Sequence, residues 1–277
     1  MEHKEGIFTG IDNLELYHQC WLPEDEPKAV LLIVHGLGEH CGRYMNVVNH
    51  FVPKGFAVYG FDHPGHGKSQ GTRVFINRFT DFIENLKLFF DMVRQWHSGK
   101  KIFLVGHSMG GLITADYLLK YQSELGGAVI SAPAVKVPED LSRIAIFAAK
   151  ILSKILPKTG IQHLDVQGVS SDPKVVQAYI DDPLVCNKKI TARLAAELIT
   201  AMESILGDAG RINLPLIILQ GTADILVEPE GARMLHEKAG SKDKTLHIYD
   251  GFYHEVFNEP DHSKVLNDVE NWLDKML

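Results

Sequence analysis

The 277-residue sequence predicts an α/β domain with a mostly parallel central sheet, an antiparallel N-terminal hairpin, helices on both faces and an inserted helical cap. Three observations support this fold class. Short, wholly apolar runs recur along the chain, amphipathic segments of helical length separate them, and one long stretch carries no strand pattern. Strands that alternate with helices form parallel sheets with right-handed crossovers. A chain of this length has room for one such domain and an insertion.

The strands are predicted from the apolar runs. Residues 28–36 (KAVLLIVHG) are apolar at every position from Ala29 to Val34, which is typical of a strand covered on both faces. A hairpin is predicted over residues 6–23, with its turn at Asp12–Asn13. The other runs are 56–62, 101–108, 126–133, 214–224 and a more mixed one at 244–251, which we expect nearer a sheet edge.

The helical patterns lie between these strands. The clearest helix is predicted over residues 77–97, where apolar side chains form one stripe, and another pattern closes the chain at 263–277. The alternation stops at residues 135–212, which show only helical segments and Pro- or Asp-rich turns. So long a stretch is not a structureless loop in a compact domain. We therefore expect a core of residues 1–134 and 213–277 and a helical cap of residues 135–212.

Composition narrows the possible functions. A formal net charge of −7 argues against nucleic-acid binding, which depends on clustered Lys and Arg. The three cysteines, odd in number and without C-x-x-C spacing, favour a reducing compartment. The N-terminal residues lack the apolar core of a signal peptide, and no run reaches about 18 apolar residues. We expect a cytoplasmic protein, and peripheral contact with a membrane surface stays open.

Ser108 lies in GHSMGG (106–111), where a strand is predicted to become a helix. A G-x-S-x-G sequence alone is a weak signal, but a strand, a sharp turn and a helix together make it specific. Gly106 and Gly110 let strand and helix approach closely, and the turn presents the hydroxyl at the carboxyl end of the sheet. Phosphate-binding glycine patterns are absent. We therefore predict that Ser108 is a nucleophile.

A serine hydroxyl needs a base to take its proton and a carboxylate to orient that base. In this topology an acid and then a histidine follow the serine, each at the end of a later strand. Asp224 ends the run 214–224 and His254 follows the run 244–251, so we predict a Ser108–Asp224–His254 triad. The other candidates are Asp208 and Asp250 for the acid, and His247 (inside a predicted strand) and His262 (at the start of a predicted helix) for the base.

Two backbone N–H groups usually bind the oxyanion of the tetrahedral intermediate. The residue after the nucleophile supplies one and the loop after an early strand supplies the other. We predict Met109 and Leu37, the latter in HGLGEH (35–40), where Gly36 and Gly38 permit close approach. The 14 histidines follow no known metal-ligand spacing, so we expect neither a metal nor a cofactor.

Six motifs together resemble the monoacylglycerol lipase and lysophospholipase group of the α/β-hydrolase superfamily. They are HGLGEHCGRY (35–44), DHPGHGKSQG (62–71), GHSMGG (106–111), DDPLVC (181–186), QGTADILV (220–227) and YDGFYHEVFNE (249–259). The resemblance extends from about Gly6 to the end of the chain. It implies hydrolysis of a monoacylglycerol to fatty acid and glycerol, without a cofactor, by the same triad and oxyanion donors.

The resemblance also implies that Glu39, Arg43 and Tyr179 form the polar end of the site, where glycerol would bind. One position departs from the pattern of the animal enzymes, which have a second histidine three residues after the catalytic one. That position is Phe257 here. A glycerol contact from this residue is therefore missing, which leaves the preference for the 1- or 2-position open.

The first segment of the cap, residues 141–156, has an apolar arc of about 200°, whereas packing on one core needs about 100°. The excess includes Ile151 and Leu152. It either lines an acyl tunnel or rests on a membrane surface, and a helix buried on two sides is the alternative. Acyl-chain length and oligomeric state stay open.

Other functions also stay open. A lysophospholipase or a short-chain carboxylesterase would use the same triad. A catalytically inactive binding protein would be expected to lack a triad residue, and all three are present. An aminopeptidase would need carboxylates in the cap to hold a free amino terminus. The cap contains Asp165, Asp172, Asp181, Asp182 and Glu197.

Overall fold

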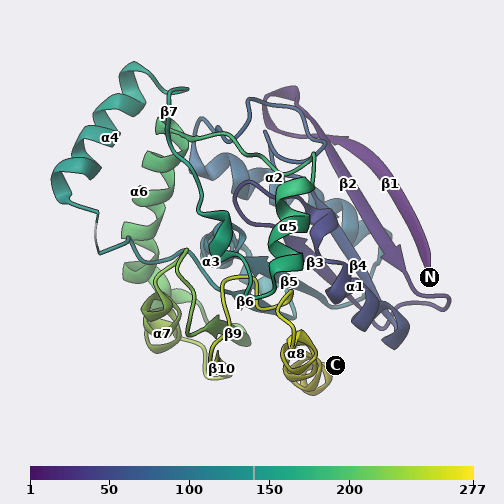
Figure 1. Ribbon diagram of the computed structural model, residues 1–277. Coiled ribbons are helices and arrows are strands. Elements are labelled where there is room, and N and C mark those ends of the chain that lie inside the picture. The colour runs from purple at the N-terminus through teal and green to yellow at the C-terminus, as the bar shows by residue number, and fades with distance from the viewer. Residues whose placement is uncertain (140) are drawn as a thin grey trace.

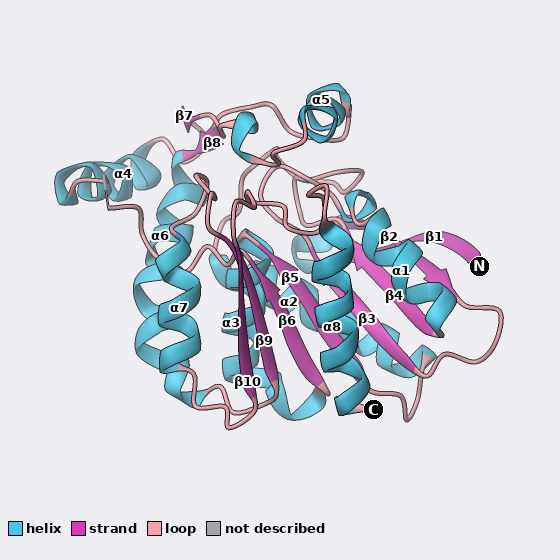
Figure 2. Cartoon of the chain, turned by 60° about the horizontal axis from the view of Figure 1, so that its bottom comes forward, coloured by secondary structure: helices cyan, strands magenta, loops and turns pink. Residues whose placement is uncertain are grey.

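The computed structural model describes residues 1–139 and 141–277. Eight strands form its central sheet: β1 (Glu2–Thr9), β2 (Glu15–Leu22), β3 (Ala29–Val34), β4 (Phe56–Phe61), β5 (Ile102–His107), β6 (Gly127–Ser131), β9 (Leu216–Gly221) and β10 (Lys244–Tyr249). Their order is β1-β2-β4-β3-β5-β6-β9-β10 (Figure 2). From β4 to β10 the neighbours are parallel, whereas β2 runs antiparallel to both β1 and β4. The predicted sheet is confirmed.

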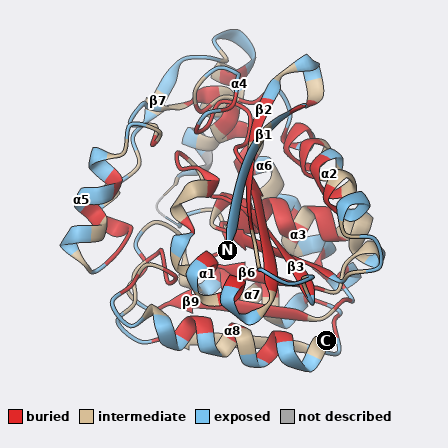
Figure 3. Ribbon diagram, turned by 90° about the vertical axis from the view of Figure 1, so that its right-hand side faces the viewer, coloured by how far each residue is buried: buried red, intermediate tan, exposed pale blue. Residues whose placement is uncertain are grey.

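Burial on both faces explains why the central strands appear in the sequence as continuous apolar runs. Every residue of β3, β4, β5, β6 and β9 is buried, because helices cover both faces (Figure 3). The edge strand β10 is only half-buried along most of its length, as its mixed composition predicted. The hairpin turn falls at Asp12 and Asn13, both with φ of 58°. Asn and Asp tolerate this left-handed conformation better than most residues.

Two apolar cores lie on the two faces of the sheet. On one face pack α1 (Met45–Phe51) and α8 (His262–Met276). On the other pack α2 (Phe79–Trp96), α3 (Met109–Tyr121), α6 (Ala192–Asp208) and α7 (Pro229–Lys238). The predicted stripe of α2 is buried along its whole length, which confirms the 3.6-residue period.

The segment between β6 and β9 contains α4 (Arg143–Ile155), α5 (Pro173–Asp181) and α6. It also contains a two-stranded antiparallel sheet of β7 (Gly160–Gln162) and β8 (Ile190–Thr191), which the sequence analysis did not predict. Strands of three and two residues are too short to show alternation. Helix α6 contributes to the core beside α3, whereas α4 packs against α6 at the periphery (Figure 1). The boundaries at residues 134 and 213 stay a prediction.

No helix of the described residues combines the length and the apolar composition needed to cross a bilayer.

Candidate active site

Ser108 joins β5 to α3 with φ of 55° and ψ of −117°, a strained conformation for a residue with a side chain. Its N–H donates to the Ser131 carbonyl at 2.9 Å, and its carbonyl accepts from the Ala134 N–H at 3.1 Å. The turn also needs small neighbours. A Cβ at Gly110 would collide with the Val34 carbonyl oxygen, and one at Gly106 would collide with a side chain of α3.

His254 lies in the loop between β10 and α8, where it meets Asp224 from the loop after β9. The distance from His254 Nδ1 to Asp224 Oδ2 is 2.8 Å. Oδ2 also accepts from Gln220 Nε2 at 2.9 Å, and Oδ1 accepts from the N–H groups of Leu226 and Val227 at 2.8 and 3.1 Å. Because the carboxylate holds the proton on Nδ1, Nε2 of His254 is the ring nitrogen that can accept a proton.

Burial and neighbouring charges shift the pKa values of Asp224 and His254 in opposite directions. Burial raises the pKa of Asp224, but His254 and the backbone N–H groups of Val227 and Leu226 together lower it by more, so the net pKa is below the ordinary value. Burial lowers the pKa of His254, but Asp224, Glu255 and Glu39 together raise it by more, so the net pKa is above 6.5. The ring of His107 lies 4.6 Å from that of His254, and burial lowers the pKa of His107 to about 3. His107 therefore adds no positive charge beside His254.

Ser108, His254, Leu37 and Met109 line one cavity of about 200 Å³. Met109 is the first residue of α3, where a backbone N–H has no acceptor within its own helix. Across the described residues no hydrogen bond joins the Ser108 hydroxyl to His254. Such bonds are often long in unliganded sites and shorten on binding. The other sequence candidates, Asp208, Asp250, His247 and His262, are absent from the lining formed by the described residues.

One wall of this cavity is apolar. Helix α6 contributes Ala195, Leu198, Ile199 and Met202, and the loops of the insertion and of the core add Leu141, Leu164, Val166, Val169, Ile190 and Leu226. Ile151 and Leu152, which were candidates for an acyl tunnel, are absent from the cavity lining formed by the described residues. Helix α4 contacts α6 from outside, so Ile151 faces outward and is 44% exposed. The part of the apolar arc of α4 that does not face α6 therefore lies on the surface of the molecule.

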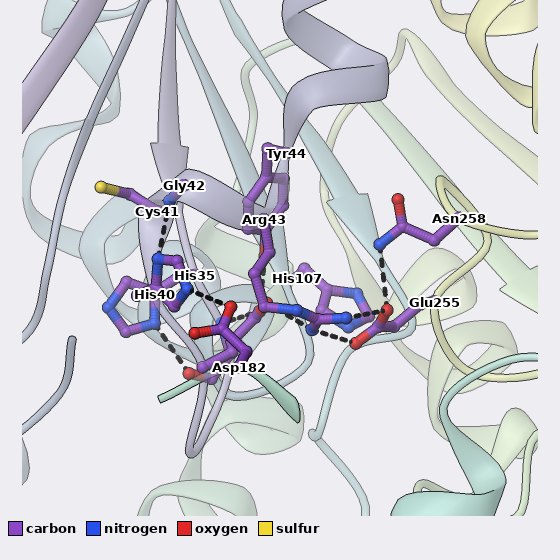
Figure 4. A network of polar contacts seen from close by, with 12 residues as sticks. His35, His40, Cys41, Gly42, Arg43, Tyr44, His107, Asp182, Glu255 and Asn258 are labelled. Carbon is purple, nitrogen blue, oxygen red and sulfur yellow. Dashed lines mark hydrogen bonds and ion pairs between the residues drawn. The ribbon is translucent and has the colours of Figure 1, made fainter. Parts of the chain in front are cut away.

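Polar side chains also line the cavity. Glu39, Tyr179 and Glu255 line it, whereas Arg43 lies behind them. Arg43 forms two hydrogen bonds with Glu255, at 2.5 and 2.9 Å, and one with Glu39 at 3.2 Å (Figure 4). Its guanidinium also lies 4.4 Å from the centre of the Tyr179 ring. The three residues implied by the resemblance come together, but the guanidinium of Arg43 is already bound by two carboxylates.

The two carboxylates differ in pKa. Burial raises the pKa of both, and Arg43 lowers both. Glu255 receives two hydrogen bonds from Arg43 and one from Asn258 at 2.9 Å, so its net pKa is low, whereas that of Glu39 is raised. Glu255 is not among the residues predicted from the sequence. Its position directly after His254 is the feature that could have indicated a role in the site.

Contacts from the inserted segment hold the loops of the site. His40, in the loop after β3, lies 2.9 Å from Asp182 at the end of α5 (Figure 4). The Glu255 N–H donates to the Val169 carbonyl at 2.8 Å. In the described part of the chain, no three potential metal ligands gather in one place. The site thus offers a hydroxyl, a base, a carboxylate and backbone donors, a set suited to acyl transfer.

The chain is similar to known proteins over most of its length. The family described as "Serine aminopeptidase, S33" matches residues 25–261. A monoacylglycerol lipase of Mycolicibacterium smegmatis is 36% identical over 97% of this chain and 96% of its own. A monoglyceride lipase of Mus musculus is 34% identical over 95% of this chain and 88% of its own. The crystal structure of the Paleococcus ferrophilus monoacylglycerol lipase superposes with a TM-score of 0.85 at 35% identity, covering 95% of this chain and 100% of its own.

These similarities confirm the predicted fold class and the resemblance stated from the motifs. The matches extend over nearly the whole chain, so core and inserted segment are both included. The chain therefore belongs to the hydrolase family described as serine aminopeptidase S33, in the group that contains the monoacylglycerol lipases.

Proposed function

We propose that this chain hydrolyses the carboxylic ester of monoacylglycerols to a fatty acid and glycerol. The observation that carries the proposal is one cavity lined by Ser108, by the Asp224-paired His254, by many apolar side chains and by a few polar ones. A single acyl chain suits the wall formed by α6. A small hydroxylated head group suits the polar side chains of Glu39, Tyr179 and Glu255. The names of the relatives support the same substrate class.

The proposed reaction proceeds through an acyl-enzyme. His254 takes the Ser108 proton as Oγ attacks the ester carbonyl, and the Leu37 and Met109 N–H groups stabilise the oxyanion. The bond to the glycerol oxygen then breaks, and His254 gives its proton to that oxygen. Water next attacks the acyl carbonyl while His254 takes one of its protons. The bond to Oγ breaks, Ser108 regains a proton from His254 and the fatty acid leaves. Asp224 keeps the imidazole in one tautomer throughout.

Steady-state hydrolysis of monoolein, compared with diolein, oleoyl lysophosphatidylcholine and p-nitrophenyl butyrate, tests this proposal. We expect a strong preference for monoolein and a fall in kcat of roughly 10⁴–10⁶-fold in Ser108→Ala. Ser204→Ala, at an exposed position of α6, is the matched control and should retain activity. Activity on the short ester alone would overturn the monoacylglycerol assignment. Preference for the lysophospholipid would make the chain a lysophospholipase.

The family description makes an aminopeptidase the second candidate. Of the cap carboxylates that left this function open, Asp165 lines the cavity, whereas Asp172 caps α5 and Asp182 contacts His40. Glu39 and Glu255 also line the cavity, but Arg43 binds both. Asp165 itself accepts from the Gln167 N–H at 3.1 Å, and one such carboxylate is a weak site for an ammonium group. We expect no turnover of aminoacyl p-nitroanilides, and turnover that exceeds ester hydrolysis would favour the second candidate.

We propose further that the outer face of α4 rests on a membrane surface. Ile144, Phe147, Ile151 and Ile155 form one stripe on this helix and are 82, 66, 44 and 70% exposed. An apolar stripe of this kind on a surface helix suits insertion at the level of the lipid head groups. A cytoplasmic location stays a prediction.

Liposome co-sedimentation tests the membrane contact. The double variant Phe147→Glu and Ile151→Glu should bind anionic vesicles more weakly than the unaltered chain, while turnover of p-nitrophenyl butyrate stays the same. Leu88→Glu, at an exposed position of α2 on the core, is the control and should bind as before. Equal binding of all three proteins would contradict the proposal.

A further inference from the structure

His35, directly after β3, is fully buried, and its two hydrogen bonds determine which ring nitrogen carries the proton. The backbone N–H of His63 donates to His35 Nε2 at 2.9 Å, so this nitrogen is the acceptor. A neutral imidazole then carries its proton on Nδ1. Nδ1 lies 2.8 Å from the carbonyl oxygen of Gly36. His35 therefore donates to that carbonyl.

The Gly36 carbonyl and the Leu37 N–H belong to one peptide unit. In a trans peptide these two groups point in opposite directions, and the described residues contain no cis peptide bond. Gly36 and Leu37 line the cavity with Ser108, whereas His35 does not belong to the described lining. A carbonyl held toward His35 therefore leaves the Leu37 N–H directed to the opposite side, toward the cavity.

We propose that His35 is a positioning residue of the proposed esterase, which keeps the Leu37 N–H aimed at the oxyanion through its hydrogen bond to the Gly36 carbonyl. The inference rests on the proposed function, since it concerns the same reaction. It adds a residue whose ring touches neither the substrate nor the triad.

The loop needs such a constraint because Leu37 lies between two glycines. Glycine accepts many backbone conformations, and Gly38 has a φ of 79°. Two other anchors lie in this loop. The Gly36 N–H donates to Glu39 Oε1 at 2.6 Å, and the Gly38 carbonyl accepts from the Cys186 N–H at 2.7 Å, but neither group belongs to the Gly36–Leu37 peptide unit. The hydrogen bond from His35 fixes the unit that carries the Leu37 N–H.

The surroundings of His35 keep its ring neutral and immobile. The rings of His63 and His66 lie 4.3 and 5.4 Å away, and all three side chains are completely buried. Burial lowers the pKa of His35 well below its ordinary value, and the two neighbouring histidines lower it further. A protonated ring would also lose the acceptor that binds the His63 N–H. The tautomer that donates to Gly36 is thus the one that the structure favours.

Two variants separate the two hydrogen bonds of His35. Asn carries an amide nitrogen near the position of Nδ1, so His35→Asn can still donate to Gly36. Gln carries an amide oxygen near the position of Nε2, so His35→Gln keeps an acceptor for His63 and loses the donor to Gly36. We expect His35→Gln to lower kcat by roughly 10- to 10³-fold, the range for loss of one oxyanion donor or less, with KM within about twofold.

Binding of a trifluoromethyl ketone with an oleoyl-length chain supplies the second readout, because its adduct with Ser108 carries an oxyanion. We expect the affinity in His35→Gln to fall by the same factor as kcat and that of His35→Asn to stay within about threefold of the unaltered chain. His63→Phe is the matched control. It alters the same buried cluster and keeps the backbone N–H, so the stability should change while the ketone affinity stays the same.

Equal losses in the Gln and Asn variants, or no loss in either, would overturn the inference. Long-range ¹⁵N spectra of the unaltered chain test it without a variant, since we expect the proton of His35 on Nδ1. A proton on Nε2 would overturn it even if neither variant folds. If the unaltered chain neither cleaves esters nor binds the ketone, the proposed function fails, whereas the spectra still decide the contact between His35 and Gly36.

Discussion

His254 is surrounded by charges that hold its proton. Burial favours the neutral imidazole, but the carboxylates of Asp224, Glu255 and Glu39 favour the imidazolium, and the result is a pKa above 6.5. A general base must be neutral to accept the Ser108 proton. The same carboxylates that stabilise the imidazolium during the reaction therefore limit the activity of the free site in acid.

This balance predicts the pH dependence of the reaction. In the unaltered chain kcat/KM should fall with decreasing pH, with a midpoint above 6.5. Glu255→Gln removes one of the charges that raise the pKa of His254, so the midpoint should move to lower pH. Asp224→Asn should move it further and lower kcat by about 10⁴-fold, because the tautomer is lost. A midpoint that stays in place in Glu255→Gln would contradict this account.

At the residue scale, the sequence predicts the residues that follow strands and misses those that act through packing. Ser108, Asp224 and His254 each follow a strand, so the motif around Ser108 and the order of the strand ends are enough to predict them. The pairing of Arg43 with Glu255 joins two segments that are 212 residues apart in the sequence, and no local pattern encodes it. The tautomer of His35 is equally hidden, because a backbone group of His63 determines it.

At the scale of elements, the approach of α3 to β3 shapes the site. Gly110, in the first turn of α3, lies so close to β3 that a Cβ would collide with the carbonyl oxygens of Val34 and His35. These carbonyls directly precede the Gly36–Leu37 peptide. A displacement of α3 would therefore change the spacing between Met109 and Leu37, the two proposed oxyanion donors.

Gly110→Ala tests this approach. We expect a loss of stability of about 1–3 kcal/mol, typical of overpacking, and a fall in kcat of at least about tenfold. Gly207→Ala is the matched control within another helix, since a Cβ there meets nothing within 4 Å. It should raise stability by about 0.4–1 kcal/mol without changing kcat. Urea unfolding and ester hydrolysis measure both effects, and unchanged kcat in Gly110→Ala would contradict the argument.

A helix or strand can be predicted from the sequence when its pattern of apolar residues corresponds to one simple pattern of burial. Strands covered on both faces gave continuous apolar runs, and α2 gave one clean stripe, so both were found from the sequence. The pair β7–β8 was missed because its few residues are mostly exposed or half-buried. The wide arc of α4 was ambiguous for a similar reason. The pattern measures apolar surface but not whether a core, a tunnel or a membrane covers it.

At the scale of the whole molecule, buried histidines tie the stability of the fold to pH. Burial lowers the pKa of His35 and His63 well below 6.5, that of His66 to about 4 and that of His107 to about 3. The ring of His63 packs against those of Phe61 and Phe82, and neither of its nitrogens has a partner among the described residues. These rings are thus neutral in the fold and gain protons when the chain unfolds in acid.

We expect the free energy of unfolding to fall as the pH decreases below 6.5, the ordinary value that applies to the unfolded chain. Each group contributes a slope of up to about 1.4 kcal/mol per pH unit until its own folded pKa is reached. For His66 this window ends at about 4 and for His107 at about 3. His254 acts in the opposite direction only above 6.5, because its raised pKa adds stability as the pH falls through that pKa, and this contribution is constant below 6.5. Burial also lowers the pKa of His18 and His97, so six histidines make the slope below 6.5 destabilising.

His63→Phe should remove one of these contributions, because a phenyl ring suits the aromatic surroundings and takes up no proton. Urea unfolding at pH 8, 6.5 and 5 measures the effect on both proteins. We expect the variant to gain stability relative to the unaltered chain between pH 6.5 and 5, by up to about 2 kcal/mol from the slope of a single group. The difference between the two proteins should stay nearly constant from pH 8 to 6.5, where histidine is mostly neutral in both states. A constant difference over the whole range would mean that protonation of His63 does not drive unfolding in acid.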